Sequence, residues 1–159
     1  IFCPEAISQE RMSSSLFFSL LFTLVAGEAG PSDEMFEDLR TAPNTVVAEA
    51  MAEDILASLQ ESGSPTADLL LERAIAAEKE QDFETSRAFL DRALIVKEDF
   101  AEAWFRRSMI FLIDEAYDQA LQDINEALTH EPRHFRAWVV LGRVLDQLGA
   151  EREALDAYR

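Results

Sequence analysis

The two tryptophans of this chain, Trp104 and Trp138, lie 34 residues apart, and each begins the same pattern of bulky and small residues. A weaker copy of the pattern begins one period earlier, at Leu70. A period of this length is typical of stacked helical units, because each unit buries its apolar face only against its neighbours. The period therefore predicts an all-α fold with a binding surface rather than an active site. The matching positions are Leu141, Gly142, Leu145, Gly149, Ala154 and Tyr158 after Trp138, and Arg107, Ser108, Phe111, Glu115, Ala120 and Ile124 after Trp104.

Each period contains two segments with the apolar spacing of a helix. In residues 101–134, two stripes of apolar residues recur at helical intervals and are separated by Asp114 and Glu115. Pro132 ends the second stripe, because proline cannot donate into a helix and disfavours the helical conformation in the preceding residue. Small residues such as Ala120 stand where two helices must approach closely. Each unit is therefore predicted to be two antiparallel helices joined by a short turn.

The composition excludes several classes of partner. The chain carries 31 acidic and 14 basic residues, a net charge of -17, which argues against nucleic acid and anionic membranes because both require clustered Lys and Arg. An acidic surface suits a basic partner, and it also serves simply to keep a protein soluble. Cys3 is the single cysteine, so the chain can form no internal disulfide and has no CxxC site.

The N-terminal region resembles a secretion signal. Residues 12–31 contain an uncharged apolar run at 16–26, which is too short to span a bilayer as a helix and is followed by small residues before Pro31. We expect cleavage near Ala29 and export, most simply to a bacterial periplasm. A membrane anchor formed by 16–26 and a cytoplasmic protein are the alternatives. Residues 1–11 show no periodicity, and we expect them to be an unstructured upstream segment or a fragment edge.

Chemical motifs are sparse. The string His130-Glu131-Pro132-Arg133-His134 matches the zinc-protease pattern H-E-x-x-H, which requires both histidines on one continuous helix. Pro132 inside the string costs a helix about 3 kcal/mol, so we interpret the string as a solvated turn and predict no metal site. The chain also has no glycine-rich phosphate loop and no G-x-S-x-G nucleophile motif. We therefore predict a protein that is not an enzyme and that binds no cofactor.

Residues 67–159 resemble tetratricopeptide repeats. The third unit matches best, with WVVLGRVLDQLGAEREALDAY carrying the Trp, Leu-Gly, Ala and Tyr positions. The second unit replaces Leu-Gly by Arg107-Ser108, and the first has Leu70 for Trp and Glu98 for Pro. The resemblance implies a right-handed α-solenoid of antiparallel helix pairs. Its units are 67–100, 101–134 and 135–159, of which the last is incomplete, so we expect a C-terminally truncated chain.

Residues 33–61 precede the repeats and hold eight acidic residues, with Arg40 as their one basic residue. Asn44 can cap a helix at about 45–61, and Ser64 followed by Pro65 is typical of the start of the first repeat helix. We expect an acidic helical pair that covers the N-terminal edge of the solenoid. A secretion signal, acidic helices and repeats together resemble the layout of small exported bacterial tetratricopeptide repeat proteins.

The resemblance also implies a binding surface, because the first helices of successive units line a concave groove. The family's chaperone-binding branch holds a peptide carboxylate with Lys, Asn, Asn, Lys and Arg. At these positions the chain has Leu71, Ile75, Arg106, Arg136 and Val140, so we predict that it does not bind a peptide carboxylate in this way. An apolar floor flanked by arginines remains, and it could hold an extended or helical peptide. The candidate partner-binding residues are Phe105, Arg106, Met109, Leu112, Arg136, Val139 and Arg143.

From these observations we expect a non-enzymatic scaffold that binds a protein or peptide in the concave groove. Two alternatives remain open, namely a self-assembling solenoid and a regulatory domain of an enzyme whose catalytic part is missing. The sequence identifies neither the partner nor the oligomeric state, because function in such folds depends on individual surface residues.

Overall fold

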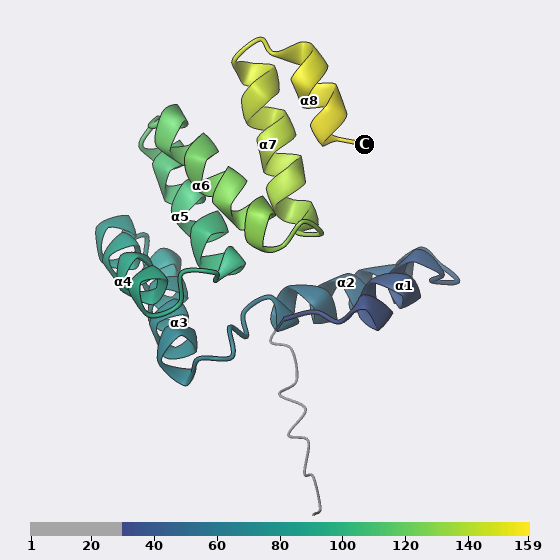
Figure 1. The fold of residues 1–159 in the computed structure, drawn as a ribbon, viewed down its shortest axis with the longest axis horizontal. Helices are drawn as coiled ribbons and strands as arrows, with labels where there is room; N and C mark the ends of the chain where they lie inside the picture. The colour runs from purple at the N-terminus through teal and green to yellow at the C-terminus, as the bar shows by residue number, and fades with distance from the viewer. Residues whose placement is uncertain (1–29) are drawn as a thin grey trace, which may run out of the picture.

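A computed structural model describes residues 30–159 of the chain (Figure 1). The segments predicted as an upstream edge and as a secretion signal, residues 1–11 and 12–31, lie outside the described residues except for Gly30 and Pro31. No helix within residues 30–159 is both long and apolar enough to cross a membrane. The described helices are α1 (Asp33–Arg40), α2 (Thr45–Ser58), α3 (Pro65–Lys79), α4 (Phe83–Val96), α5 (Ala101–Ile113), α6 (Tyr117–His130), α7 (Phe135–Gln147) and α8 (Glu151–Ala157).

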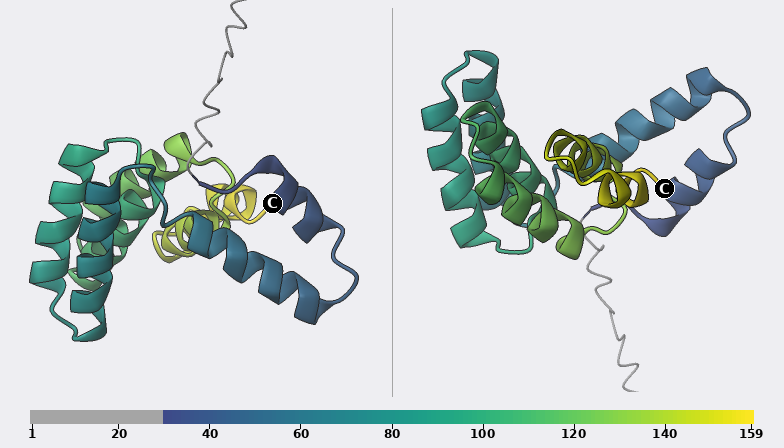
Figure 2. Two further views of the ribbon diagram at one scale, coloured as in Figure 1. Left: turned by 90° about the horizontal axis from the view of Figure 1, so that it is seen from below. Right: turned by 90° about the horizontal axis from the view of Figure 1, so that it is seen from above.

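Consecutive helices pack as antiparallel hairpins, which confirms the predicted fold class. Helix α3 packs with α4, α5 with α6, and α7 with α8, and each hairpin contacts the next through α4–α5 and α6–α7. The three hairpins follow one another along an arc (Figures 1 and 2). Two predicted caps are also confirmed, since Asn44 accepts a hydrogen bond from the backbone N–H of Val47 at 3.0 Å and Ser64 accepts one from Ala67 at 3.4 Å.

The 34-residue period is repeated in the backbone conformation. The turn after the first helix of each unit contains one residue with positive φ, namely Gln81, Glu115 and Gly149, at 61°, 56° and 78°. The two Trp indoles repeat a hydrogen bond in the same way. Trp104 donates to the carbonyl of Glu98 at 2.6 Å, and Trp138 donates to that of Pro132 at 2.7 Å. Each Trp therefore ties the start of its helix to the preceding turn.

A substitution in one of these turns tests their conformation. We expect Gly149→Ala to lower the free energy of unfolding by about 1 kcal/mol, because an L side chain is strained at this φ. No atom lies within 4 Å of the position of the added Cβ, so backbone strain is the only cost. Thermal unfolding followed by circular dichroism measures the effect. The exposed helical substitution Gln147→Ala should change stability by less than about 0.5 kcal/mol, and an unchanged Gly149→Ala would contradict the turn conformation.

Arg107 occupies the position where the repeat pattern has Leu, and the structure shows why a cation is accepted there. Its guanidinium donates to the buried carboxylate of Asp123 at 2.7 and 2.9 Å and to Asp91 of the preceding unit at 2.8 Å. The guanidinium also lies 4.7 Å from the ring centroid of Trp104. Burial lowers the pKa of Arg107, but the hydrogen bonds with the two carboxylates outweigh it and the net pKa is raised. The residue thus links two hairpins.

Residues 31–61, which we name the arm, do not lie where we expected. We expected this acidic pair to cover the N-terminal edge of the solenoid, but α1 and α2 extend away from α3 and α4, towards the side of α7 and α8 (Figures 1 and 2). Arg133, in the turn before α7, forms an ion pair with Asp33 and lies 4.3 Å from the ring centroid of Phe36, so α1 is held beside the third unit. The buried Leu59, at the end of α2, borders a hollow with Phe100 and Ala101 at the start of α5.

Candidate functional site

An open hollow lies between the first helices of units two and three. It has a volume of about 560 Å³, and we name it the α5–α7 cleft. Apolar side chains from both helices line it, and Arg143, Glu115 and Asp146 supply charge of both signs. Its lining residues are Met109, Leu112, Ile113, Glu115, Tyr117, Val140, Arg143, Val144, Asp146 and Gln147. An apolar surface with a few charged groups is the usual character of a site for a peptide segment.

The predicted groove residues are only partly brought together. Met109, Leu112 and Arg143 line the α5–α7 cleft, as predicted for a shared surface. Val139 lies elsewhere, in a separate hollow with Trp138 and Tyr158. The predicted residues therefore form one compact group of three rather than a continuous groove floor.

Phe105 does not lie on the accessible groove floor, where we expected it. Its side chain is 1 % exposed and packs with Ile124 and Ala137 in the core between units two and three. The guanidinium of Arg136 covers the ring, with 4.9 Å from its central carbon to the ring centroid. Phe105 therefore cannot touch a partner in this conformation, because the third unit covers the position that the repeat pattern assigns to the groove.

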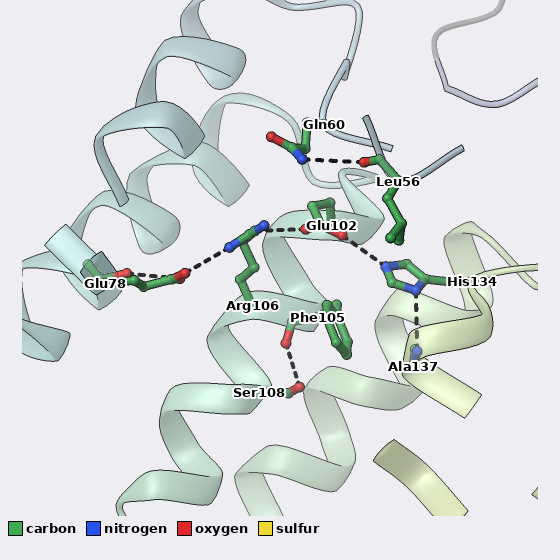
Figure 3. Close-up of polar contacts among 10 residues, drawn as sticks. Leu56, Gln60, Glu78, Glu102, Phe105, Arg106, Ser108, His134 and Ala137 are labelled. Atoms are coloured by element: carbon green, nitrogen blue, oxygen red, sulfur yellow. Dashed lines mark hydrogen bonds and ion pairs between the residues drawn. The ribbon is translucent and has the colours of Figure 1, made fainter. Parts of the chain in front are cut away.

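Arg106 is also occupied, as part of a chain of polar groups that crosses all three units (Figure 3). Its guanidinium donates to Glu102 on the same helix and to Glu78 on α3, both at 2.7 Å. Glu78 in turn accepts from the hydroxyl of Ser86 at 3.3 Å. Because its cation already has two carboxylate partners, Arg106 is a structural link between units rather than a free cation on the groove.

His134 completes this chain from the third unit. Its Nε2 lies 3.1 Å from the carboxylate of Glu102, and both side chains are buried. Its Nδ1 accepts a hydrogen bond from the backbone N–H of Ala137 at 3.3 Å, so the ring caps α7. With Nδ1 accepting from Ala137, Nε2 is the ring nitrogen that donates to Glu102.

This position of His134 corrects our interpretation of the HEPRH string as fully solvated. The turn itself is confirmed, since His130 ends α6 and His134 precedes α7. His134 is nevertheless buried, because Glu102, far away in the sequence, supplies a partner for it. No group of three or more His, Cys, Asp or Glu side chains within residues 30–159 is arranged to hold a metal ion.

Neither Glu102 nor Glu78 was predicted as a member of this polar chain. Glu102 and Arg106 are four residues apart on one helix, a spacing that favours an ion pair and was available from the sequence. Glu78 lies 28 residues before Arg106, and no local pattern connects them. Within the described residues, no buried side-chain nitrogen or oxygen lacks a hydrogen-bond partner, so the chain of polar groups is complete.

Known proteins resemble this chain both in sequence and in structure. No protein-family model matches the chain. A TPR repeat-containing protein of Rhizobium etli is 32 % identical over 126 residues, which are 79 % of this chain and 62 % of that protein. The chain thus spans about three fifths of the length of this curated relative. The crystal structure of the TPR protein MamA matches with a TM-score of 0.56 and 17 % identity, over 78 % of this chain and 80 % of that one, and shows a shared fold.

Proposed function

Because the chain is homologous to a TPR repeat-containing protein and shares the fold of the TPR protein MamA, we propose that it is a non-enzymatic scaffold that holds a segment of a protein partner in the α5–α7 cleft. Proteins of this kind generally mediate protein interactions, through surfaces formed by successive repeats. The observation that carries the proposal is the open apolar cleft between α5 and α7. Elsewhere along these two helices, Phe105, Arg106 and Arg136 are already engaged with other parts of the chain.

The charges at the cleft indicate the chemistry of the partner segment. Met109 and Ile113 present exposed apolar side chains, which favour apolar anchors on the partner. Glu115 and Asp146 stand at the same cleft against the single cation Arg143, and the chain as a whole has a net charge of -17. A segment with apolar anchors and basic flanking residues therefore suits this surface, and its association should slow as salt concentration rises.

Charge placed inside the cleft tests the proposal. We expect the double substitution Met109→Glu/Ile113→Glu to reduce partner recovery at least tenfold, because an apolar anchor would then meet two carboxylates. The measurement is affinity capture from cells that express the protein, with bound proteins quantified by mass spectrometry. The matched control is Ile95→Glu/Val96→Glu, which changes two exposed apolar residues of α4. Equal recovery of every bound protein with both variants would reject the cleft as the binding site.

A further inference from the structure

We propose that the arm, residues 31–61, is a reversibly docked segment that covers the N-terminal part of the concave face and limits a partner to the α5–α7 cleft. When the arm is displaced, the binding surface extends along α5 and α7 towards α3. This inference rests on the proposed function and describes how the same site is regulated. Four features of the structure support this proposal: the burial at the end of α2, the surface beneath that end, the contacts of Arg133, and the exposure of the rest of the arm.

The arm is buried at the end of α2 and exposed along most of its length. Ile55 is fully buried and Leu59 nearly so, whereas Val46 near the start of the same helix is 75 % exposed. Leu59 borders a hollow with Phe100 and Ala101, at the start of α5. The burial of α2 is therefore concentrated in its last turn and in the residue that follows it.

The surface beneath this end belongs to the concave side of the repeats. In the close-up, the side chain of Leu56 points towards the Glu102–His134 pair, and the side-chain amide of Gln60 donates to the backbone carbonyl of Leu56 at 3.3 Å (Figure 3). Gln60 also borders a hollow of α3 whose other residues include those that the repeat pattern assigns to the groove of unit one. Those groove residues are Asp68, Leu71, Glu72, Ile75 and Lys79. The end of α2 thus occupies space that a longer ligand running from the cleft towards α3 would need.

Arg133, in the turn between α6 and α7, holds the other end of the arm. It forms an ion pair with Asp33 and donates to the carbonyl of Pro31 at 3.3 Å. Its guanidinium also lies 4.3 Å from the ring centroid of Phe36 on α1. Glu131 orients the same guanidinium through hydrogen bonds at 3.0 and 3.2 Å. The two ends of the arm are therefore fastened at separate points of the solenoid, close to the starts of α5 and α7.

Between the Arg133 contacts and the end of α2, few residues of the arm are buried. Helix α1 has no buried residue, and Ile55 is the one buried residue of α2. Regions with few buried apolar contacts open locally at low free-energy cost, without unfolding the rest of the protein. The buried residues of the arm are Pro31, Ile55 and Leu59, and Arg133 contacts its N-terminal end. A partner that competes for the concave face can therefore displace the arm while the three hairpins stay folded.

The docked state is tested by distances within the full chain. Spin labels at Glu49→Cys on α2 and Gln122→Cys on α6, both exposed, are placed in a Cys3→Ser background. We expect a narrow distance distribution for the parent chain and a broad one after Phe36→Ala/Leu59→Asp, which weakens both ends of the arm. Val46→Asp, on the exposed part of α2, is the matched control and should leave the distribution narrow. A broad distribution in the parent, or a narrow one in the double variant, would overturn docking.

The effect on the groove is read from partner capture with the same variants. Proteins whose recovery depends on Met109 and Ile113 should be recovered at least threefold more with Phe36→Ala/Leu59→Asp than with Val46→Asp. Unchanged recovery together with a broadened distance distribution would overturn the regulatory role of the arm. If capture shows no protein that depends on the cleft, the proposed function fails, and the distance measurement alone then decides whether the arm is docked. Circular dichroism of each variant verifies that α3–α8 remain folded.

Discussion

Replacing Phe105 by alanine is expected to lower the free energy of unfolding by about 3–5 kcal/mol, the largest effect of a single substitution that we predict. The ring is buried between units two and three, where it packs against Ile124, Ala137 and the imidazole of His134, whose ring centroid is 4.7 Å away. Alanine would leave a cavity that rigid helix packing cannot fully close. Urea denaturation followed by the fluorescence of the two tryptophans measures the change.

Val139→Ala is the matched control, because Val139 occupies the same repeat position one unit later. Its side chain is 50 % exposed, so truncation should cost less than about 1 kcal/mol. Phe105 and Val139 thus occupy the same repeat position, but their different burial predicts a large loss of stability for one substitution and a small loss for the other. Equal losses of stability for the two variants would contradict the packing of α5 against α7 that the structure shows.

His134→Ala is expected to cost about 3 kcal/mol of unfolding free energy. The substitution removes the cap of α7, a loss of about 1 kcal/mol, and it removes a buried hydrogen bond to the carboxylate of Glu102. Glu102 would keep Arg106 as a partner but lose the donor on its other oxygen. The same urea denaturation measures the loss, and His130→Ala, in the α6–α7 turn region, should change stability by less than about 0.5 kcal/mol.

His134→Asn separates the two contributions. An asparagine can accept the hydrogen bond of the helix cap but is too short to occupy the place of the imidazole beside Glu102. We expect it to recover about 1 kcal/mol of the stability that His134→Ala loses. An asparagine variant no more stable than the alanine variant would show that the cap contributes nothing. Because His134 also touches Phe105, the double variant His134→Ala/Phe105→Ala should lose less stability than the sum of the single losses.

The repeat pattern predicted the helices well because helix formation depends on residues that are close in sequence. Pro132 and Pro65 mark a helix end and a helix start, and the spacing of Ala120 and Ile124 identifies the buried face of α6. The pattern could not predict Arg107, because its partners Asp91 and Asp123 each lie 16 residues away on other helices. A cation at an apolar position of the repeat is stable only when such partners are brought to it.

The candidate site was predicted less completely than the fold, and the reason is again the range of the interactions. The pattern assigned Met109, Phe105 and Val139 to one concave face, since it describes the direction in which each side chain leaves its helix. It contains no information on which neighbour covers that side chain. The third hairpin covers Phe105 and leaves Met109 open, while Val139 lies in a different hollow.

The sequence by itself determined that this chain folds into successive helical hairpins, because a 34-residue period sets the local helix lengths, turns and small-residue positions that each hairpin needs. The tertiary structure alone decided which groove residues are accessible and where the arm lies. Those outcomes depend on contacts such as Arg133 with Asp33 and His134 with Glu102, which join residues 100 and 32 positions apart. Such pairs do not follow the 34-residue spacing of the repeat, and only the packing of the hairpins brings them together.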